Sequence, residues 1–278
     1  MRTPRRQLNL LLAVLLVLGI AACGDDDDGG GGGSASGSAS GSASGSASGS
    51  PAEEEDEEAA GGGDFCGSLQ AFNAAIFQVQ LEDDASEEEI AAAHETLDPL
   101  WSAVEESAPE EQAETVDELG ATIDALGEGD ATGFNDDATS ETYFTMLSEV
   151  VPDCVEETTE VTGVDYAFEG VPETLPSGPS GLLFVNESEN EEEHEFIIFK
   201  KAEGDARSAE EILNDPATQE QGPGEFAGAV FAQPGATSGA FVDLSAGDYI
   251  AVCFIPVGGG EDGPPHFTQG MVAEFSVS

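Results

Sequence analysis

The chain has 278 residues, of which 58 are acidic and 6 are basic, so that its formal net charge is −52. Such a surface repels the phosphates of nucleic acids and anionic lipid head groups, which argues against both as partners and favours cationic ones. A solvated surface suited to high salt is the alternative explanation of the charge. Hydrophobic residues still make up 39% of the chain, so about two folded domains are expected.

Residues 1–22 have the pattern of an export signal. Arg2, Arg5 and Arg6 precede a short apolar run at residues 8–20, which is too short for a stable membrane span. The sequence Ile20-Ala21-Ala22-Cys23 resembles the lipobox of bacterial lipoproteins. This resemblance implies cleavage before Cys23, lipidation of its thiol and anchoring at the extracytoplasmic face of the cell membrane. An ordinary secretory signal is the alternative.

Residues 23–63 are predicted to be a disordered tether. They consist of an aspartate run, a glycine run, a repeated Ser-Ala-Ser-Gly tract and a glutamate run. Such a segment has too few apolar groups to offset the conformational entropy lost on folding. A flexible tether of this length reaches roughly 35 Å on average.

Residues 64–160 are predicted to form a small antiparallel helical bundle. Apolar residues recur there at spacings of three and four, which is typical of amphipathic helices. The four predicted apolar stripes are Phe65, Leu69, Phe72 and Ile76; Ile90, Ala93 and Leu97; Val116, Leu119, Ile123 and Leu126; and Tyr143, Leu147 and Val150.

Local signals place the ends of these helices. The residues from Ser86 to Glu89 match a capping box that opens the second helix. Pro99 is expected to break or kink this helix, and Pro109 is expected to open the third. Thr139 or Ser140 is expected to cap the fourth helix.

A disulfide between Cys66 and Cys154 is predicted to join the two ends of the bundle, because thiols pair readily outside the cytoplasm. A loop of this length stabilises a fold by about 4 kcal/mol in the chain-entropy model. The bundle contains no recognisable catalytic set, so it is interpreted as a spacer or a docking module.

Residues 161–278 are predicted to form an antiparallel sandwich or barrel. Short strand-like runs alternate there with Gly, Pro and Asp. The chain as a whole is therefore expected to be an α+β multidomain protein, with a helical bundle followed by a Greek-key β-sandwich. The seven runs are residues 166–168, 182–185, 196–199, 229–231, 240–244, 249–255 and 271–277. Residues 208–213 are expected to add one or two helical turns.

Two segments of this C-terminal part resemble the copper-binding segments of cupredoxins. The first segment is Phe184-Val185-Asn186 followed by His194-Glu195-Phe196. It resembles the cupredoxin segment in which a strand ends in Asn, a loop follows, and a His begins the next strand. Residues 249–253, Pro265-His266 and Gly270-Met271-Val272 resemble their C-terminal copper loop. The resemblance implies that His194, Cys253, His266 and Met271 bind one type 1 copper. It also implies single-electron transfer rather than catalysis.

The loop between Cys253 and His266 departs from the family pattern. Twelve residues lie between these two ligands, where plastocyanin has two. The polar, glycine-rich residues 257–263 are expected to form the tip of a hairpin. Ligand geometry is then retained only if Pro256 and Pro264-Pro265 hold the base of the loop.

Cysteine use agrees with a metal site. Lipidation of Cys23 and pairing of Cys66 with Cys154 leave Cys253 as a free thiol. A buried thiol that packs as a small apolar residue is the alternative for Cys253. The acidic residues Glu191, Glu192, Glu193 and Glu195 are expected to favour the protonated form of His194.

Three functions remain open from the sequence. The first is electron transfer to a cationic, exported redox protein. The second is a metal-free cupredoxin-like binding or scaffolding module on a lipid-anchored stalk, and the third is a surface copper reservoir or chaperone.

Overall fold

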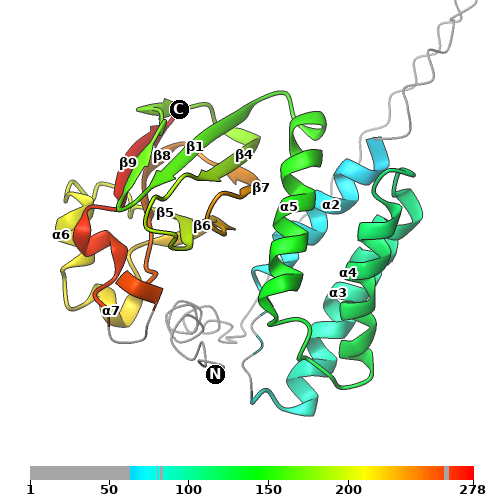
Figure 1. The fold of residues 1–278 in the computed structure, drawn as a ribbon. Helices are drawn as coiled ribbons and strands as arrows, with labels where there is room; N and C mark the ends of the chain where they lie inside the picture. Colours follow the sequence, from blue (N-terminus) through cyan, green and yellow to red (C-terminus); the bar gives the residue numbers. More distant parts are fainter. Residues whose placement is uncertain (1–62, 80, 82–83, 260–262) are drawn as a thin grey trace, which may run out of the picture.

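The computed structural model describes residues 63–79, 81, 84–259 and 263–278, in which helices precede a two-sheet part (Figure 1). The predicted signal peptide, Cys23 and all but the last residue of the predicted tether lie outside the described residues. Among the helices of the described ranges, none is both long and apolar enough to cross a membrane.

The helical part follows the predicted apolar stripes. Phe65, Leu69 and Phe72 of the first stripe are buried, and the other stripes are buried as well. Apolar side chains at this spacing share one helix face, so their burial stabilises the bundle. The four helices are α2 (Gly63–Ile76), α3 (Glu87–Ser107), α4 (Ala113–Gly127) and α5 (Asp137–Cys154).

Helix ends follow the local signals in part. The capping box of α3 is confirmed, because Ser86 accepts from the amide of Glu89 and the Glu89 carboxylate accepts from the amide of Ser86. Pro99 does not break α3, which continues through it with buried residues on both sides, while the alternative of a kink stays a prediction. Burial there outweighs the backbone hydrogen bond that Pro99 cannot make.

The two later helices begin at other residues than predicted. Helix α4 begins at Ala113, after a turn in which Gln112 donates to the carbonyl oxygen of Pro109 at 2.9 Å. Helix α5 is capped by Asp136, which accepts from the amide of Ala138 at 2.9 Å, so the predicted caps are wrong.

The C-terminal part is a sandwich of two mixed sheets. The four-stranded sheet has the order β2-β1-β4-β7, and the five-stranded sheet has the order β3-β9-β8-β5-β6. The strands are β1 (Thr158–Val164), β2 (Ala167–Glu169), β3 (Thr174–Leu175), β4 (Gly178–Asn186), β5 (His194–Lys200), β6 (Glu225–Ala232), β7 (Thr237–Leu244), β8 (Gly247–Val252) and β9 (Val272–Val277).

Two strand pairs correct the predicted antiparallel arrangement. Strand β1 runs parallel to β4, and β3 runs parallel to β9. Strand β1 begins at Thr158, within the segment that the sequence assigned to helices. It was not predicted as a strand because few large apolar side chains mark it: of its residues only Val161 and Gly163 are buried.

The central strand β5 is buried on both faces. Phe196 and Ile198 belong to the main core between the sheets, whereas Ile197 and Phe199 belong to a second core. Helix α6 (Ala209–Leu213), which follows a capping box at Ser208, contributes to this second core, and α7 (Thr218–Gln221) comes next along the chain. A strand that is covered on both sides needs a continuous apolar run, which the sequence of β5 provides.

The helices pack directly on the four-stranded sheet. Helix α5 lies beside β7 and β6 in Figure 1, and the side chains of both parts form one continuous core. Gly239 allows this approach, because a Cβ atom on it would lie 2.5 Å from the backbone of Leu147. The Asn73 side chain of α2 also donates to the carbonyl oxygen of Phe241 at 3.1 Å. The helical part is therefore fixed against the sandwich through buried contacts.

Candidate metal centre

His194 is the first residue of β5 and is completely buried. Asn186, at the end of β4, holds the preceding loop, because its side-chain amide donates to the carbonyl oxygens of Glu192 and Ala232, each at 2.9 Å. Gly163 of β1 lies beside the imidazole, where a Cβ atom would lie 3.3 Å from Cδ2 of His194. The imidazole is therefore confined from two neighbouring strands.

Cys253 directly follows β8, which ends at Val252, and is also completely buried. Its amide donates to the carbonyl oxygen of Met271 at 3.2 Å. Its own carbonyl oxygen accepts from the amide of Phe267 at 2.9 Å. The backbone of Cys253 is thus hydrogen-bonded to the segments that carry the other two predicted C-terminal ligands.

The base of the long loop between Cys253 and His266 is closed by backbone pairing. Pro256 and Pro265 form an antiparallel bridge. The amide of Val257 donates to the carbonyl oxygen of Pro264 at 3.0 Å, and the amide of His266 donates to that of Ile255 at 2.9 Å. The prolines therefore lie at the paired base of the loop, as the sequence required, and the remaining insert residues do not separate the two ligands.

The three predicted nitrogen and sulfur ligands converge. Nδ1 of His266 lies 3.1 Å from Nδ1 of His194 and 3.3 Å from Sγ of Cys253. Ligand atoms of all three residues lie within 4.8 Å of one another. Two imidazoles and a thiol in one buried cluster match the donor set of trigonal copper sites. The residues present therefore fit such a metal.

Met271 lies next to this cluster along the backbone. Gly270 turns the chain with a φ of 116°, and the amide of Met271 donates to the carbonyl oxygen of His266 at 3.2 Å. The Met271 side chain is fully buried. A sulfur ligand from Met271 remains a prediction, consistent with this placement.

Burial controls the proton affinity of the ligands. It lowers the pKa of His194 to about 4, with a further contribution from His266, although Glu192 and Asp165 act in the opposite direction. Burial likewise lowers the pKa of His266 and raises that of the Cys253 thiol. Glu192 thus favours the protonated form of His194, as expected, but the net pKa is lowered because the desolvation of a buried imidazolium outweighs this charge.

Glu195 follows His194 in β5, and its burial was not predicted from the sequence. Its side chain is fully buried, and Oε1 accepts from the amide of Phe254 at 2.7 Å. Burial raises the pKa of Glu195 to about 8. The surrounding glutamates suggested a solvated acidic run, whereas β5 is covered on both faces, so this side chain is buried.

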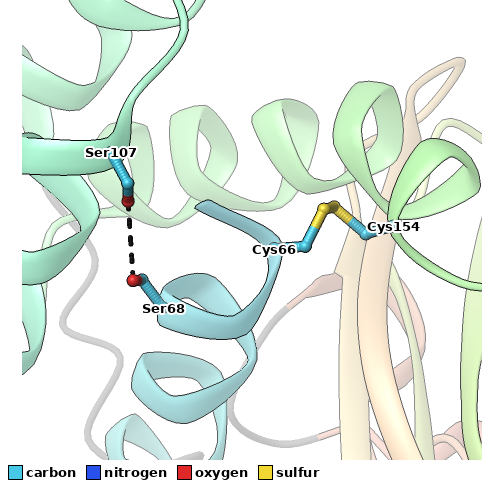
Figure 2. The surroundings of a disulfide bond; sticks show 4 residues. All are labelled: Cys66, Ser68, Ser107 and Cys154. Carbon is cyan, nitrogen blue, oxygen red and sulfur yellow. Dashed lines mark hydrogen bonds between the residues drawn. A yellow bond between two sulfur atoms is a disulfide. The ribbon is translucent and has the colours of Figure 1, made fainter. Parts of the chain in front are cut away.

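The predicted disulfide of the helical part is confirmed. Cys66, near the start of α2, is bonded to Cys154, the last residue of α5 (Figure 2). Cys253 is the free cysteine of the described residues. The lipidation predicted at Cys23 falls outside them.

The C-terminal part is a two-sheet sandwich with a buried His-Cys-His cluster, as the sequence resemblance to cupredoxins implied. No family model matches the sequence, and no curated protein is significantly similar to it. Among solved structures, the chain is similar to reduced auracyanin from Roseiflexus castenholzii (22% identity, 45% of this chain and 98% of that chain, TM-score 0.32). It is also similar to the "blue" copper protein auracyanin A from Chloroflexus aurantiacus (22% identity, 44% and 98%, TM-score 0.29). A third similar structure is rusticyanin from Thiobacillus ferrooxidans (19% identity, 45% and 79%, TM-score 0.28).

Proposed function

We propose that the chain is a copper-binding protein that transfers single electrons at the outer face of a cell membrane. The observation that carries this proposal is the buried convergence of His194, Cys253 and His266. Copper bound there would supply a one-electron redox couple, since a thiolate and two imidazoles suit both of its oxidation states. No substrate is turned over in this function.

The protein's own residues would keep the ligands in place during electron transfer. The imidazoles and the thiol are held by β5, by the end of β8 and by the paired loop base. A packed interior resists rearrangement, so the ligand positions change little between oxidation states. Complete burial of the three residues also excludes water from their donor atoms.

The deciding experiment is a titration of the copper-free protein with Cu(II), followed by visible spectroscopy. We expect one equivalent to produce an intense thiolate-to-copper charge-transfer band that is absent from Cys253→Ser. The matched control is His94→Gln, because His94 lies on α3 with its Nε2 atom 3.6 Å from Asp98 and takes no part in the cluster. Absence of the band and of stoichiometric copper in the wild-type protein would overturn the proposal.

A metal-free binding or scaffolding module is the second candidate. It is favoured by one observation: Nδ1 of His266 lies within hydrogen-bond distance of both His194 and Cys253. Such a cluster can satisfy its own buried polar atoms in part. Failure to bind copper in the titration would support this metal-free binding or scaffolding function. Stoichiometric copper that binds tightly but does not exchange electrons would instead support a reservoir.

Membrane anchoring through lipidated Cys23 is part of the same proposal and rests on the lipobox-like sequence. Detergent partitioning of the protein from its native cells tests it. We expect the wild-type chain in the detergent phase and Cys23→Ser in the aqueous phase.

The net charge of −52 further supports a cationic, exported redox partner, whose association rate should fall steeply as ionic strength rises.

A further inference from the structure

The two nitrogens of the His266 imidazole face chemically different neighbours. Nδ1 faces the Cys253 thiol at 3.3 Å and Nδ1 of His194 at 3.1 Å. Nε2 faces a carboxylate, because Oε2 of Glu192 lies 3.3 Å away, in a charge contact whose geometry is not that of a hydrogen bond. A thiol can donate a hydrogen bond, whereas an ionised carboxylate can only accept one. A neutral His266 therefore interacts favourably with both neighbours only when its N–H is at Nε2, beside the negative carboxylate, and Nδ1 is an acceptor.

Glu192 is held in this position by other hydrogen bonds. Its Oε2 atom accepts from the Asn190 side chain at 2.8 Å, and its Oε1 atom accepts from the amide of Gly258. Its carbonyl oxygen accepts from the Asn186 side chain at 2.9 Å. Only 12% of the side chain is exposed. The carboxylate is thus fixed by the loop between β4 and β5 and by the insert that follows Val257.

We propose that Glu192 is a positioning residue of the metal centre, which keeps the His266 proton on Nε2 and leaves Nδ1 free to bind the metal. This inference rests on the proposed function. Histidine ligands commonly donate their second N–H to a carboxylate, which fixes the tautomer and makes the ligand more basic. Because Glu192 also binds Gly258, the insert that sets this chain apart from plastocyanin supports a ligand instead of disturbing it.

The neighbouring histidine should behave differently. If Nδ1 of His266 is an acceptor, then Nδ1 of His194 carries the proton between the two rings at 3.1 Å. Nε2 of His194, like Nε2 of His266, is buried and has no hydrogen-bond partner, but no carboxylate lies within ion-pair distance of it among the described residues. Metal binding through Nδ1 then requires His194, but not His266, to exchange its tautomer.

The first test uses nitrogen NMR of the copper-free protein at neutral pH. We expect the Nε2–H tautomer for His266 in the wild-type protein and a mixture of tautomers in Glu192→Ala. Glu192→Gln retains an acceptor oxygen and should restore the Nε2–H form. The matched control is Glu191→Ala, since Glu191 is the adjacent, exposed acidic residue of the same loop. An Nδ1–H tautomer in the wild-type protein, or no change in Glu192→Ala, would overturn the proposal.

The second test measures the reduction potential of the copper-loaded protein. A negative charge beside His266 favours the oxidised, more positive metal, so Glu192→Gln should raise the potential more than Glu191→Gln. We expect the equilibrium with a redox dye to differ by about tenfold between the two variants, which corresponds to about 59 mV for one electron. Equal potentials would overturn the role of Glu192. If the wild-type protein binds no copper, the proposed function fails, whereas the NMR experiment still decides whether Glu192 sets the tautomer.

Discussion

The amide of Val257 donates a hydrogen bond to the carbonyl oxygen of Pro264 at 3.0 Å, across the base of the segment between Cys253 and His266. With the Pro256–Pro265 bridge, this bond makes the base of the segment a short antiparallel pair. The positions of the two ligands are therefore set by the paired base and depend little on the length of the tip.

Replacing Pro265 by Gly should weaken copper binding without removing it. Pro265 has a φ of −60° and directly precedes His266, so the ring restricts the unbound chain to the conformation that the site needs. Loss of this restriction costs roughly 0.4–1 kcal/mol, which is about twofold to fivefold in affinity. Competition with a chelator of known copper affinity measures the change. Pro234→Gly, in the turn between β6 and β7, is the control, and an equal loss in both variants would contradict the role of the loop base.

Replacing Gly163 by Ala should displace His194. The added Cβ would lie 2.9 Å from Cζ of Phe184 and 3.3 Å from Cδ2 of His194, in a buried part of β1. Overpacking of this kind costs about 1–3 kcal/mol of stability. Urea unfolding of the copper-free protein and copper affinity should both show a loss. Gly67→Ala is the control, because nothing lies within 4 Å of its added Cβ.

Glu195 should make the copper-free fold less stable as the pH rises. The pKa of Glu195 is raised from an ordinary value of 4.5 to about 8, so its stabilising contribution is complete below pH 4.5 and is lost as the pH rises through 8. The slope should approach about 1.4 kcal/mol per pH unit within this window. His194 has the opposite sign: its pKa is lowered from 6.5 to about 4, so it reduces stability as the pH falls between these values.

Urea unfolding between pH 4.5 and 8 separates the two groups. Glu195→Gln retains an acceptor for the amide of Phe254 and removes the titrating carboxyl, so its loss of stability toward alkaline pH should disappear. Glu187→Gln, which changes an exposed acidic residue, should keep the wild-type profile. A wild-type profile in Glu195→Gln would show that this carboxyl is ionised in the fold.

The Cys66–Cys154 disulfide should contribute strongly to stability. It joins residues 88 positions apart, and loss of such a bond typically costs about 2–5 kcal/mol. Urea unfolding measures this cost. It compares the double variant Cys66→Ser/Cys154→Ser with the wild-type protein in the absence and in the presence of reductant. Ser68→Ala is the control. The hydrogen bond between Ser68 and Ser107 lies near the disulfide in Figure 2, but at 3.5 Å it is weak, so its loss should change stability little. An unchanged unfolding midpoint in the double variant would contradict the prediction.

Local features of the structure followed from local signals in the sequence. The capping box at Ser86 is a short pattern whose hydrogen bonds form within four residues, so its meaning does not depend on the rest of the fold. The same holds for the apolar stripes of the helices. Pro99 shows the limit of this reasoning, because its effect on α3 depends on side chains that bury the helix from outside.

Features that depend on distant partners were harder to predict. The parallel pairing of β1 with β4 leaves no mark in the residues of β1, and the burial of Glu195 follows from layers on both faces of β5. The convergence of His194, Cys253 and His266 was predicted from a family resemblance, since their spacing alone does not bring them together. The role proposed for Glu192 could not be predicted from the sequence, because it rests on one contact with His266 and another with Gly258, both distant along the chain.

The disulfide has a mechanical consequence. A pulling force applied to the chain before Cys66 passes through the bond to Cys154 and then into β1, since a covalent bond is far stiffer than a helix bundle. The segment between the two cysteines, which are 88 positions apart, is bypassed and carries no load. The force instead meets the ladder of β1 and β4, whose parallel strands resist it with several hydrogen bonds at once. Tension on the N-terminal side would therefore be borne by the sheet that also holds Gly163 beside His194.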